Sequence, residues 1–373
     1  MVHAATRGAR EMNAYEIFAA LAFILGACVG SFLNVAIYRL PRDLSVNEPR
    51  RSFCPACQHQ IPWYQNMPLL SWLALRGRCA NCGGRISFRY FVVELLTALF
   101  FLVLWQTFPP LLAVGYWVFI ALVLAATFID FEHFIIPDEI SIGGTVLGVI
   151  ASVVIPQLMH TDNRVAALLY SAGAAALGYA LLWLVLEVGK LAFGRKRIRL
   201  AGPTPFSWKR QGEDADFAVG DERSLWSEFF ARESDQMLLT CASATLQDRA
   251  FADTILRFHY DRVQIGSDHF LLDQLDEIRG EVTEIRIPRE AMGRGDLKFL
   301  ACIGAFLGWQ AVLFSVFAGS LLGSIVGLAT LVIGKRVWSL KLPFGPYLAA
   351  GAVIWLFFGA ALLRWYQTQM FPH

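Results

Sequence analysis

Four cysteines in the first quarter of the chain have the spacing of a metal site. Cys54 and Cys57 form one C-x2-C pair, and Cys79 and Cys82 form a second pair after a gap of 21 residues. Two such pairs are typical of tetrahedral thiolate zinc sites, and a glycine after the second pair lets backbone N–H groups turn toward sulfur. Four thiolates leave no open position for water, so the pattern predicts a structural Zn²⁺.

Disulfide bonds and unrelated buried thiols are the alternative interpretations of these cysteines. Disulfides are disfavoured on the cytoplasmic side of a membrane, which is kept reducing. A zinc ion would also explain how a segment of about 50 residues folds, because so short a segment buries little apolar core. Cys28, Cys241 and Cys302 have no partner at this spacing and are interpreted as packing residues.

Two aspartates stand where apolar segments meet polar ones. Asp130 closes a long apolar run and is followed by an Ile-Pro-Asp string that ends at Asp138. Asp296 lies in a Gly-Arg-Gly-Asp string that opens another apolar run. Two carboxylates at equal depth on different helices can share one proton. One then acts as a base on water and the other as an acid on a scissile carbonyl, as in aspartic proteases.

The alternative role for each aspartate is a helix cap or a solvated residue, which is the commoner role of a single aspartate at a helix end. The agreement of Asp130 and Asp296 in depth and in side favours a catalytic pair, with Asp138 as the reserve candidate. Glu132 and His133, which follow the first aspartate, are interpreted as solvated residues.

Two glutamates lie within apolar runs, where a carboxylate is either a functional group or a polar contact between helices. Glu187 stands near the end of its run beside Lys190, which favours a role at the helix end. Glu94 is therefore the stronger functional candidate.

The elements that carry these residues are predicted to be membrane helices. The chain is 56% hydrophobic and 17% charged, with 29 Phe and 11 Trp among its 373 residues. This composition excludes a mostly disordered chain and a secreted disulfide scaffold, and a net charge of +2 gives no reason to expect a nucleic-acid partner. Eight apolar runs are long enough to cross a bilayer core of about 30 Å. They are roughly 14–38, 90–108, 111–130, 139–159, 165–189, 298–317, 319–334 and 345–365.

The positions of lysine and arginine predict the orientation of the chain in the membrane. Of the 32 basic residues, 28 lie in the three segments 39–89, 190–298 and 335–341. With eight spans these segments share one side, the cytoplasm, and both termini lie outside it. The aspartates Asp130 and Asp296 are then at the cytoplasmic edge of the membrane.

The predicted fold class is an all-α polytopic membrane protein with two cytoplasmic insertions. The expected segments are an N-terminal tail with the first span, a zinc-binding segment, spans two to five, a linker with an insert domain, and the remaining spans. Their bounds are 1–38, 39–89, 90–189, 190–292 and 293–373.

The 190–292 segment is expected to hold a basic linker and a small β-containing domain. Residues 195–212 are basic and contain Gly and Pro, which is typical of a linker. Residues 213–287 hold β-rich stretches and no catalytic constellation. The stretches are Met237–Leu246, Thr254–Val263 and Val282–Ile287.

Several separated strings resemble the bacterial prepilin peptidase family, the bifunctional type IV leader peptidases and N-methyltransferases of the GxGD type. The resemblance covers about residues 20–190 and 288–365. In this family Phe91 is often Pro, and the 213–287 insert is absent from typical members. The matching strings are Gly30–Pro41, Arg51–Cys57, Asn66–Trp72, Gly77–Cys79, Ile86–Tyr90, Asp130 with Ile136-Pro137-Asp138, and Gly293–Lys298.

The resemblance implies a multi-pass enzyme of the bacterial inner membrane. Its substrates would be type IV prepilins or type II secretion pseudopilins, cut after a Gly on the cytoplasmic side by Asp130 and Asp296. The new N-terminal residue, usually Phe, would be methylated with S-adenosylmethionine. No Rossmann-type GxGxxG unit is present, so the methyltransferase expectation comes from the resemblance of residues 30–94 alone. Glu94 is the acid expected in or near the cofactor pocket.

Two other function classes compete with this enzyme. A transporter or proton-coupled channel would use intramembrane carboxylates as an ion relay, but Asp130 and Asp296 lie at the membrane edge and no inverted repeat is present. A non-catalytic scaffold would use the zinc segment and the insert to recruit assembly proteins. Cleavage of a prepilin would distinguish the enzyme from both.

Overall fold

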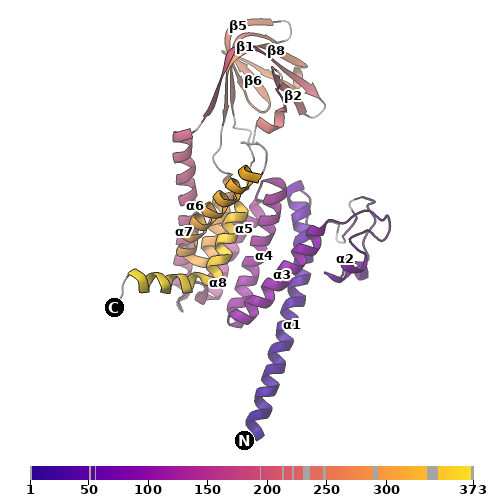
Figure 1. The fold of residues 1–373 in the computed structure, drawn as a ribbon, viewed down its shortest axis with the longest axis vertical. Coiled ribbons are helices and arrows are strands. Elements are labelled where there is room, and N and C mark those ends of the chain that lie inside the picture. Colours follow the sequence, from indigo (N-terminus) through magenta and orange to yellow (C-terminus); the bar gives the residue numbers. More distant parts are fainter. Residues whose placement is uncertain are drawn as a thin grey trace. The chain divides into compact units, whose positions relative to one another are not determined.

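The computed structural model divides the chain into two units (Figure 1). Unit 1 comprises Met1–Trp183 and Gly293–His373, and unit 2 comprises Leu184–Met292. The structure describes residues 2–49, 52–54, 56–193, 195–211, 214–220, 222–229, 236–246, 249–288, 293–333 and 343–370.

Long apolar helices build unit 1, and unit 2 begins within the last of its fourth-to-sixth helices. They are α1 (Val2–Arg39), α3 (Phe88–Thr107), α4 (Pro110–His133), α5 (Asp138–Val154), α6 (Arg164–Phe193), α7 (Arg294–Ile333) and α8 (Gly345–Met370), with a short α2 (Leu70–Ala74) between α1 and α3. Local sequence sets several helix starts. The Ser87 hydroxyl accepts a hydrogen bond from the N–H of Arg89 at the start of α3, and Pro110 occupies the first turn of α4.

Six helices of the described residues are long and apolar enough to cross a membrane, so the expected count of eight is not confirmed. The run 139–159 forms α5, whose 17 residues span only about 26 Å before the chain turns at Pro156. The runs 298–317 and 319–334 belong to one element, α7. The candidate spans are Tyr15–Arg42, Phe88–Thr107, Pro110–His133, Arg164–Gly189, Arg294–Thr330 and Gly345–Met370.

Helix α7 is interrupted at Gly308, whose φ of 81° and ψ of 177° are not helical. The bend is sharp, because a Cβ added at Gly304 would lie 2.9 Å from Cγ2 of Val312. In a straight helix these positions are about 12 Å apart along the axis. Only glycine adopts this backbone conformation readily, so the break between the two parts of α7 is fixed at residue 308.

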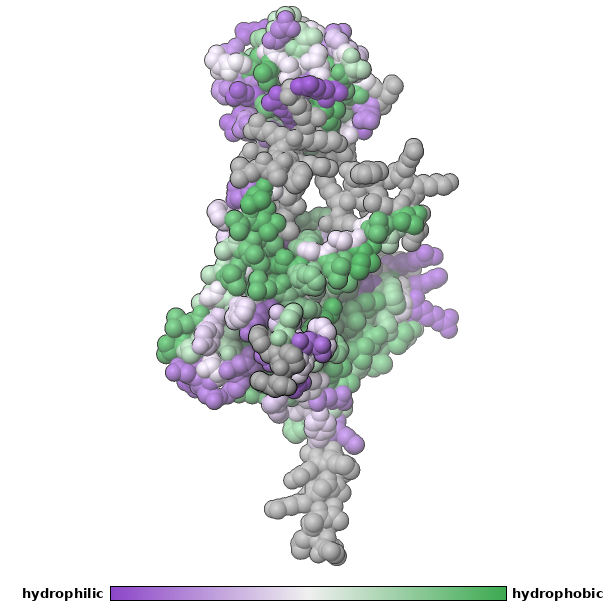
Figure 2. Space-filling view, turned by 60° about the vertical axis from the view of Figure 1, so that its left-hand side comes forward, coloured by the Kyte–Doolittle hydropathy of each residue, from purple (hydrophilic) through white to green (hydrophobic). Residues whose placement is uncertain are grey.

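Close contacts between backbones hold the helices of unit 1 together. A Cβ at Gly30 of α1 would lie 2.7 Å from Cα of Glu94 in α3, and one at Gly178 of α6 would lie 2.6 Å from the Leu300 carbonyl oxygen in α7. Small residues at contact points are typical of membrane helix pairs, which associate by close packing. Large apolar side chains such as Phe18 stay exposed on the outer faces, and Figure 2 shows hydrophobic residues gathered over the helices. This surface suits contact with lipid.

Unit 2 is an antiparallel sheet of eight strands in the order β3-β2-β1-β8-β4-β5-β6-β7. Its buried side chains form one hydrophobic cluster that includes Phe206, Met237 and Phe258. The strands are β1 (Arg195–Gln211), β2 (Asp214–Val219), β3 (Glu222–Leu225), β4 (Met237–Leu246), β5 (Arg249–Phe258), β6 (Arg262–Ile265), β7 (Asp268–Leu271) and β8 (Glu277–Pro288).

The expectation of a β-containing insert is confirmed, and the sheet is larger than its three predicted stretches. Met237–Leu246 is β4, and Val282–Ile287 lies within β8. Thr254–Val263 is not one strand, because β5 ends at Phe258 and β6 begins at Arg262 after a turn.

The predicted linker at 195–212 is wrong, since residues 195–211 form strand β1. Prolines normally argue against a strand, but they are tolerated at bulges. The pairing of β1 with β8 shifts register between Arg199 and Thr204, which accommodates Pro203. Beyond the shift, Phe206 and Trp208 alternate into the core and anchor the strand.

Candidate functional site

The segment between α1 and α3 brings the four cysteines together in two similar turns. The N–H of Gln58 donates to the carbonyl oxygen of Cys54 (2.8 Å), and the N–H of Gly83 donates to that of Cys79 (2.9 Å). Each turn therefore repeats the same contact four residues after its first cysteine. The four Sγ atoms, including that of Cys82, lie within 4.8 Å of one another.

The geometry of this cluster fits a tetrahedral metal ion. The Sγ atoms of Cys54 and Cys82 are 3.9 Å apart. Zinc–sulfur bonds of about 2.3 Å in a tetrahedron give sulfur–sulfur separations of about 3.8 Å. The cluster could therefore hold one ion of zinc size with little movement.

Hydrogen bonds in the cluster favour the thiolate form that binds metals. The pKa of Cys57 is lowered to about 7, chiefly by the backbone N–H of His59 and then by the side-chain amide of Asn81. The backbone N–H groups of Cys82 and Asn81 lower the pKa of Cys79 as well. Thiolates are the metal-binding state of cysteine, so these turns prepare the sulfurs for a cation.

Asp130 and Asp296 are buried at the ends of two helices of unit 1. Asp130 lies in the last turn of α4 with 5% of its surface exposed, and Asp296 lies in the first turn of α7 with 8% exposed. The two carboxyl groups are close enough to interact electrostatically. The structure thus brings together two aspartates that are 166 positions apart in the sequence.

The start of α8 completes the surroundings of this pair. The N–H of Gly345 donates to Oδ2 of Asp130 (3.0 Å). A Cβ at Gly345 would lie only 2.6 Å from the same oxygen, and one at Gly295 would lie 3.2 Å from Cβ of Ile136. Close backbone approach at two glycines therefore encloses the pair, which can act as a buried acid and base.

Asp138, the reserve candidate, points elsewhere. Nζ of Lys298 donates to its Oδ1 over 2.6 Å, and 60% of the Asp138 side chain is exposed. This ion pair joins the start of α5 to the first turn of α7, on which Asp296 lies. Asp138 therefore positions the helix rather than joining the buried pair.

Glu94 of α3 is buried against the segment that carries the cysteines. Its Oε2 accepts a hydrogen bond from the N–H of Leu69 (2.7 Å), and the Ser31 hydroxyl contributes a second hydrogen bond. Leu69 has φ 64° and ψ −52°, and its neighbours Pro68 and Leu70 are joined by a hydrogen bond, so it is the centre of a strained γ-turn. The buried carboxylate holds this turn in place.

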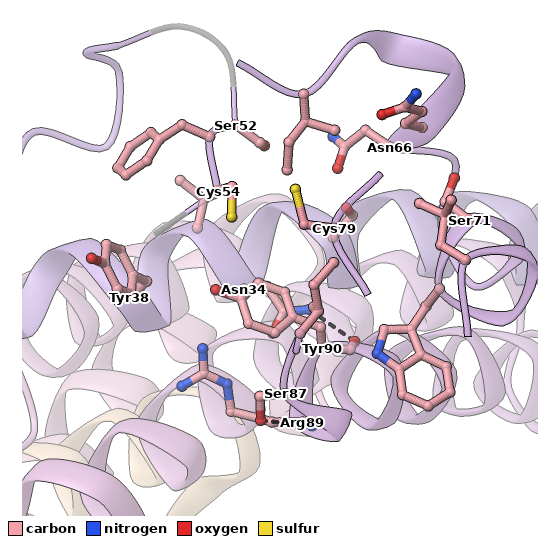
Figure 3. Close-up of a pocket in the computed structure, with 18 of the residues that line it drawn as sticks. Asn34, Tyr38, Ser52, Cys54, Asn66, Ser71, Cys79, Ser87, Arg89 and Tyr90 are labelled. Atoms are coloured by element: carbon pink, nitrogen blue, oxygen red, sulfur yellow. Dashed lines mark hydrogen bonds between the residues drawn. The ribbon is translucent and has the colours of Figure 1, made fainter. Parts of the chain in front are cut away.

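A cavity of about 400 Å³ lies between α1, the cysteine segment and the start of α3 (Figure 3). Three buried polar atoms of residues that line it have no hydrogen-bond partner: Oδ1 of Asn34, Nε1 of Trp72 and Nε of Arg89. Glu94 and Cys54 also line it. A cavity of this size with unpaired polar atoms is suited to a small polar ligand.

Sequence reasoning missed the role of Glu132, which it interpreted as solvated. The Glu132 side chain lines the same cavity and forms an ion pair with Arg89. Glu132 belongs to α4, two residues beyond Asp130, so this helix contributes to the cavity as well as to the buried pair. The signal available in the sequence was Arg89 itself, a basic residue at the start of an apolar run.

Comparison with known proteins gives family matches over most of the helical unit. The Bacterial Peptidase A24 N-terminal domain matches residues 24–108, and the Type IV leader peptidase family matches residues 117–198 and 279–328. The second match passes over residues 199–278, which hold most of the sheet. No solved structure gives a significant match.

Relatives named Prepilin leader peptidase/N-methyltransferase are similar over nearly the whole chain. The Aeromonas salmonicida (strain A449) protein is 30% identical over 383 residues, which cover 95% of each chain. The Aeromonas hydrophila protein is 29% identical over 385 residues, with the same coverage of 95%. A Myxococcus xanthus (strain DK1622) relative is 46% identical over 140 residues, covering 36% of this chain and 40% of its own.

Proposed function

The chain belongs to the type IV leader peptidase family, and we propose that it is a membrane aspartic endopeptidase and N-methyltransferase. It cleaves the leader of type IV prepilins or type II secretion pseudopilins and methylates the new N-terminal residue. The observation that carries the peptidase half is the burial of Asp130 and Asp296 within electrostatic reach of each other. Family membership favours this enzyme over a transporter or an assembly scaffold.

Asp130 and Asp296 cleave the peptide bond as a pair that shares one proton. The ionised carboxylate takes a proton from water while the water oxygen attacks the scissile carbonyl carbon, and the protonated partner gives its proton to the carbonyl oxygen. Collapse of the tetrahedral intermediate breaks the C–N bond, and the leaving amine takes up a proton. Burial of both groups keeps the shared proton from exchanging freely with solvent.

The position of the pair suits a substrate that is itself a membrane protein. Six apolar helices make this chain an integral membrane protein. Asp130 ends one span and Asp296 begins another, so a bond just before the hydrophobic helix of a substrate would lie at their depth. The basic segment between the first two spans places this edge at the cytoplasmic face of the bacterial inner membrane.

We assign a structural zinc ion to Cys54, Cys57, Cys79 and Cys82. The sulfur separations and the lowered pKa of Cys57 and Cys79 support this assignment. The ion would crosslink two turns of a segment whose longest helix has five residues. Its loss should unfold this segment first, because binding and folding are coupled there.

The methyltransferase half is assigned to the N-terminal part of the chain, with Glu94 as a cofactor-contacting acid. When bound, S-adenosylmethionine supplies the methyl group that the freed amine takes up, with S-adenosylhomocysteine and a proton as the other products. Asn34, Arg89 and Glu94 supply unpaired polar atoms or buried charge beside a cavity, and therefore fit a polar, charged cofactor.

Aspartate-to-asparagine variants test the peptidase half. Asp130→Asn and Asp296→Asn keep the shape of the side chain but remove the shared acid, so cleavage of a prepilin in detergent should fall by about 10⁴-fold or more. Asp138→Asn is the matched control and should have a milder effect. Mass analysis of the pilin reports leader removal, and methylation as an added ~14 Da. Cleavage by either buried variant above a few per cent of wild type would refute the assignment.

A further inference from the structure

We propose that the cavity beside the cysteine cluster is the binding site of the methyl donor, with Glu94 as the counter-ion of its sulfonium group. The inference rests on the proposed methyltransferase function and adds to it the place of binding and the residues that recognise the ligand. The last turn of α4 then separates this site from the aspartate pair.

Charge is the first argument for this site. Glu94 is 8% exposed and lines the cavity, and its known partners are the neutral donors Leu69 N–H and Ser31. In the part of the chain that the structure describes, no lysine or arginine forms an ion pair with it. A buried carboxylate without a cation is costly, so the cavity is suited to a ligand that supplies one. S-adenosylmethionine carries a sulfonium and an ammonium group.

Unpaired polar atoms are the second argument. Asn34 uses its Nδ2 to donate to the Tyr90 carbonyl oxygen (3.0 Å), which leaves Oδ1 as an acceptor without a donor. Nε of Arg89 and Nε1 of Trp72 are donors without acceptors. A nucleoside joined to an amino acid offers both kinds of group, the amino and hydroxyl donors and the carboxylate acceptor. The aromatic residues Tyr38 and Tyr90 on the wall suit a flat base.

The arrangement of α4 relates this site to the site of cleavage. Asp130 and Glu132 are two positions apart, which is about 200° around a helix. Accordingly, Asp130 contacts the start of α8, whereas Glu132 pairs with Arg89 at the cavity wall. The amine freed at the aspartates and the methyl donor are thus held on opposite faces of one helical turn.

Calorimetric titration of the detergent-solubilised full chain tests the inference by binding rather than by activity. The probes are S-adenosylmethionine and S-adenosylhomocysteine, which differ by the methyl group and the sulfonium charge. Wild type should bind the charged compound more tightly. In Glu94→Gln, whose amide oxygen can still accept from Leu69, affinity for S-adenosylmethionine should fall about tenfold or more, and the preference between the two compounds should disappear.

Two further variants make the result specific to the cavity. Asn34→Ala should weaken both compounds, because it removes the unpaired acceptor. Glu139→Gln makes the same chemical change at an exposed position of α5 and should bind like wild type. Zinc content and melting temperature report whether each variant is folded.

Several outcomes would overturn the inference. Wild type that binds neither compound, or a Glu94→Gln variant that keeps the wild-type preference, excludes the cavity as the site. Prepilin cleavage is assayed in the same preparations. Cleavage together with Glu94-independent binding overturns this inference alone, whereas Glu94-dependent binding in a chain that cuts no prepilin overturns the proposed peptidase and leaves the cavity.

Discussion

The aspartate pair and the cysteine-bordered cavity are positioned by different means. Asp130 and Asp296 lie on long helices whose backbones approach closely at Gly295 and Gly345. The cavity is bordered by a segment with one five-residue helix, a strained turn and four clustered thiols. In the first region helix packing fixes the geometry, whereas in the second it depends on polar anchors and a metal ion. Each region should therefore fail through a change that the other tolerates.

Gly345→Ala should have the largest effect of the changes that separate the two regions. Its Cβ would lie 2.6 Å from Oδ2 of Asp130 and displace the carboxylate. Since a misplacement of about 1 Å can cost about 10²-fold in rate, prepilin cleavage should fall by about that factor, with binding of S-adenosylmethionine unchanged. Gly143→Ala is the matched control, because nothing lies within 4 Å of its added Cβ. Equal cleavage by both variants would show that close packing does not position the pair.

The double variant Cys54→Ser, Cys57→Ser should damage the opposite region. Removal of one C-x2-C pair should abolish zinc binding, and binding of S-adenosylmethionine should be lost because Cys54 lines the cavity. Cleavage should fall much less, since the pair is held by helices. Metal analysis, calorimetry and the prepilin assay measure the three effects. Cys28→Ser, at an exposed cysteine of α1, is the control. Loss of cleavage as severe as in Asp130→Asn would make the two regions one functional unit.

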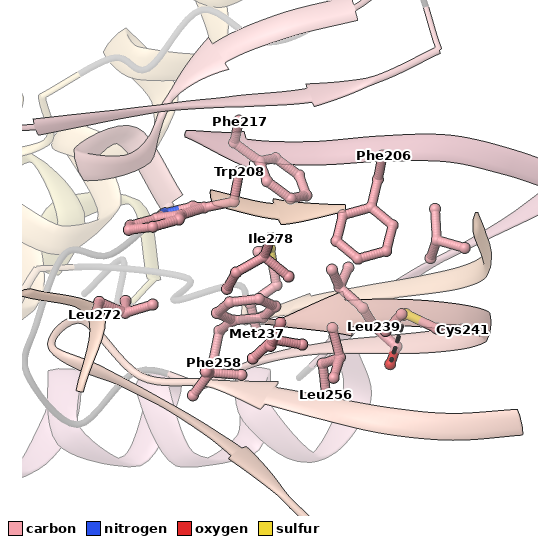
Figure 4. Packing of buried hydrophobic residues seen from close by; sticks show 14 of the residues in the cluster. Phe206, Trp208, Phe217, Met237, Leu239, Cys241, Leu256, Phe258, Leu272 and Ile278 are labelled. Carbon is pink, nitrogen blue, oxygen red and sulfur yellow. Dashed lines mark hydrogen bonds between the residues drawn. The ribbon is translucent and has the colours of Figure 1, made fainter. Parts of the chain in front are cut away.

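Excision of the sheet should have the smallest effect on either region. The sheet has a hydrophobic core of its own, which includes Trp208, Leu239 and Phe258 (Figure 4). Arg199 of β1 pairs with Glu284 of β8, so residues 200–283 can be replaced by an Asn-Gly hairpin turn. Because the family match passes over residues 199–278, both prepilin cleavage and S-adenosylmethionine binding should be retained. Loss of cleavage in a chain that still inserts and binds zinc would give the sheet a role in substrate handling.

Local patterns in the sequence allowed part of this structure to be predicted. The cysteine cluster follows from two short spacings, and its four Sγ atoms do lie together. The edges of apolar runs drew attention to Asp130 and Asp296, and the structure buries both. Their catalytic role stays a prediction, as does the orientation of the termini.

Features that depend on distant contacts could not be predicted in this way. The ion pair of Arg89 with Glu132 joins residues 43 positions apart on different helices, and nothing in either local pattern indicates it. Strand β1 was missed because its proline is accommodated by a bulge that only the partner strand β8 defines. The count of spans failed because hydropathy does not report a backbone break such as that at Gly308.

The break at Gly308 has a mechanical consequence. Membranes differ in thickness, and a long helix usually adjusts to them by tilting as a rigid rod. In α7 the part that carries Asp296 ends at the break, and the remainder packs against α8, where a Cβ at Gly351 would lie 2.9 Å from Cα of Ser315. Tilting of this outer part is absorbed at the bend. The aspartate pair is thereby insulated from lateral strain in the bilayer.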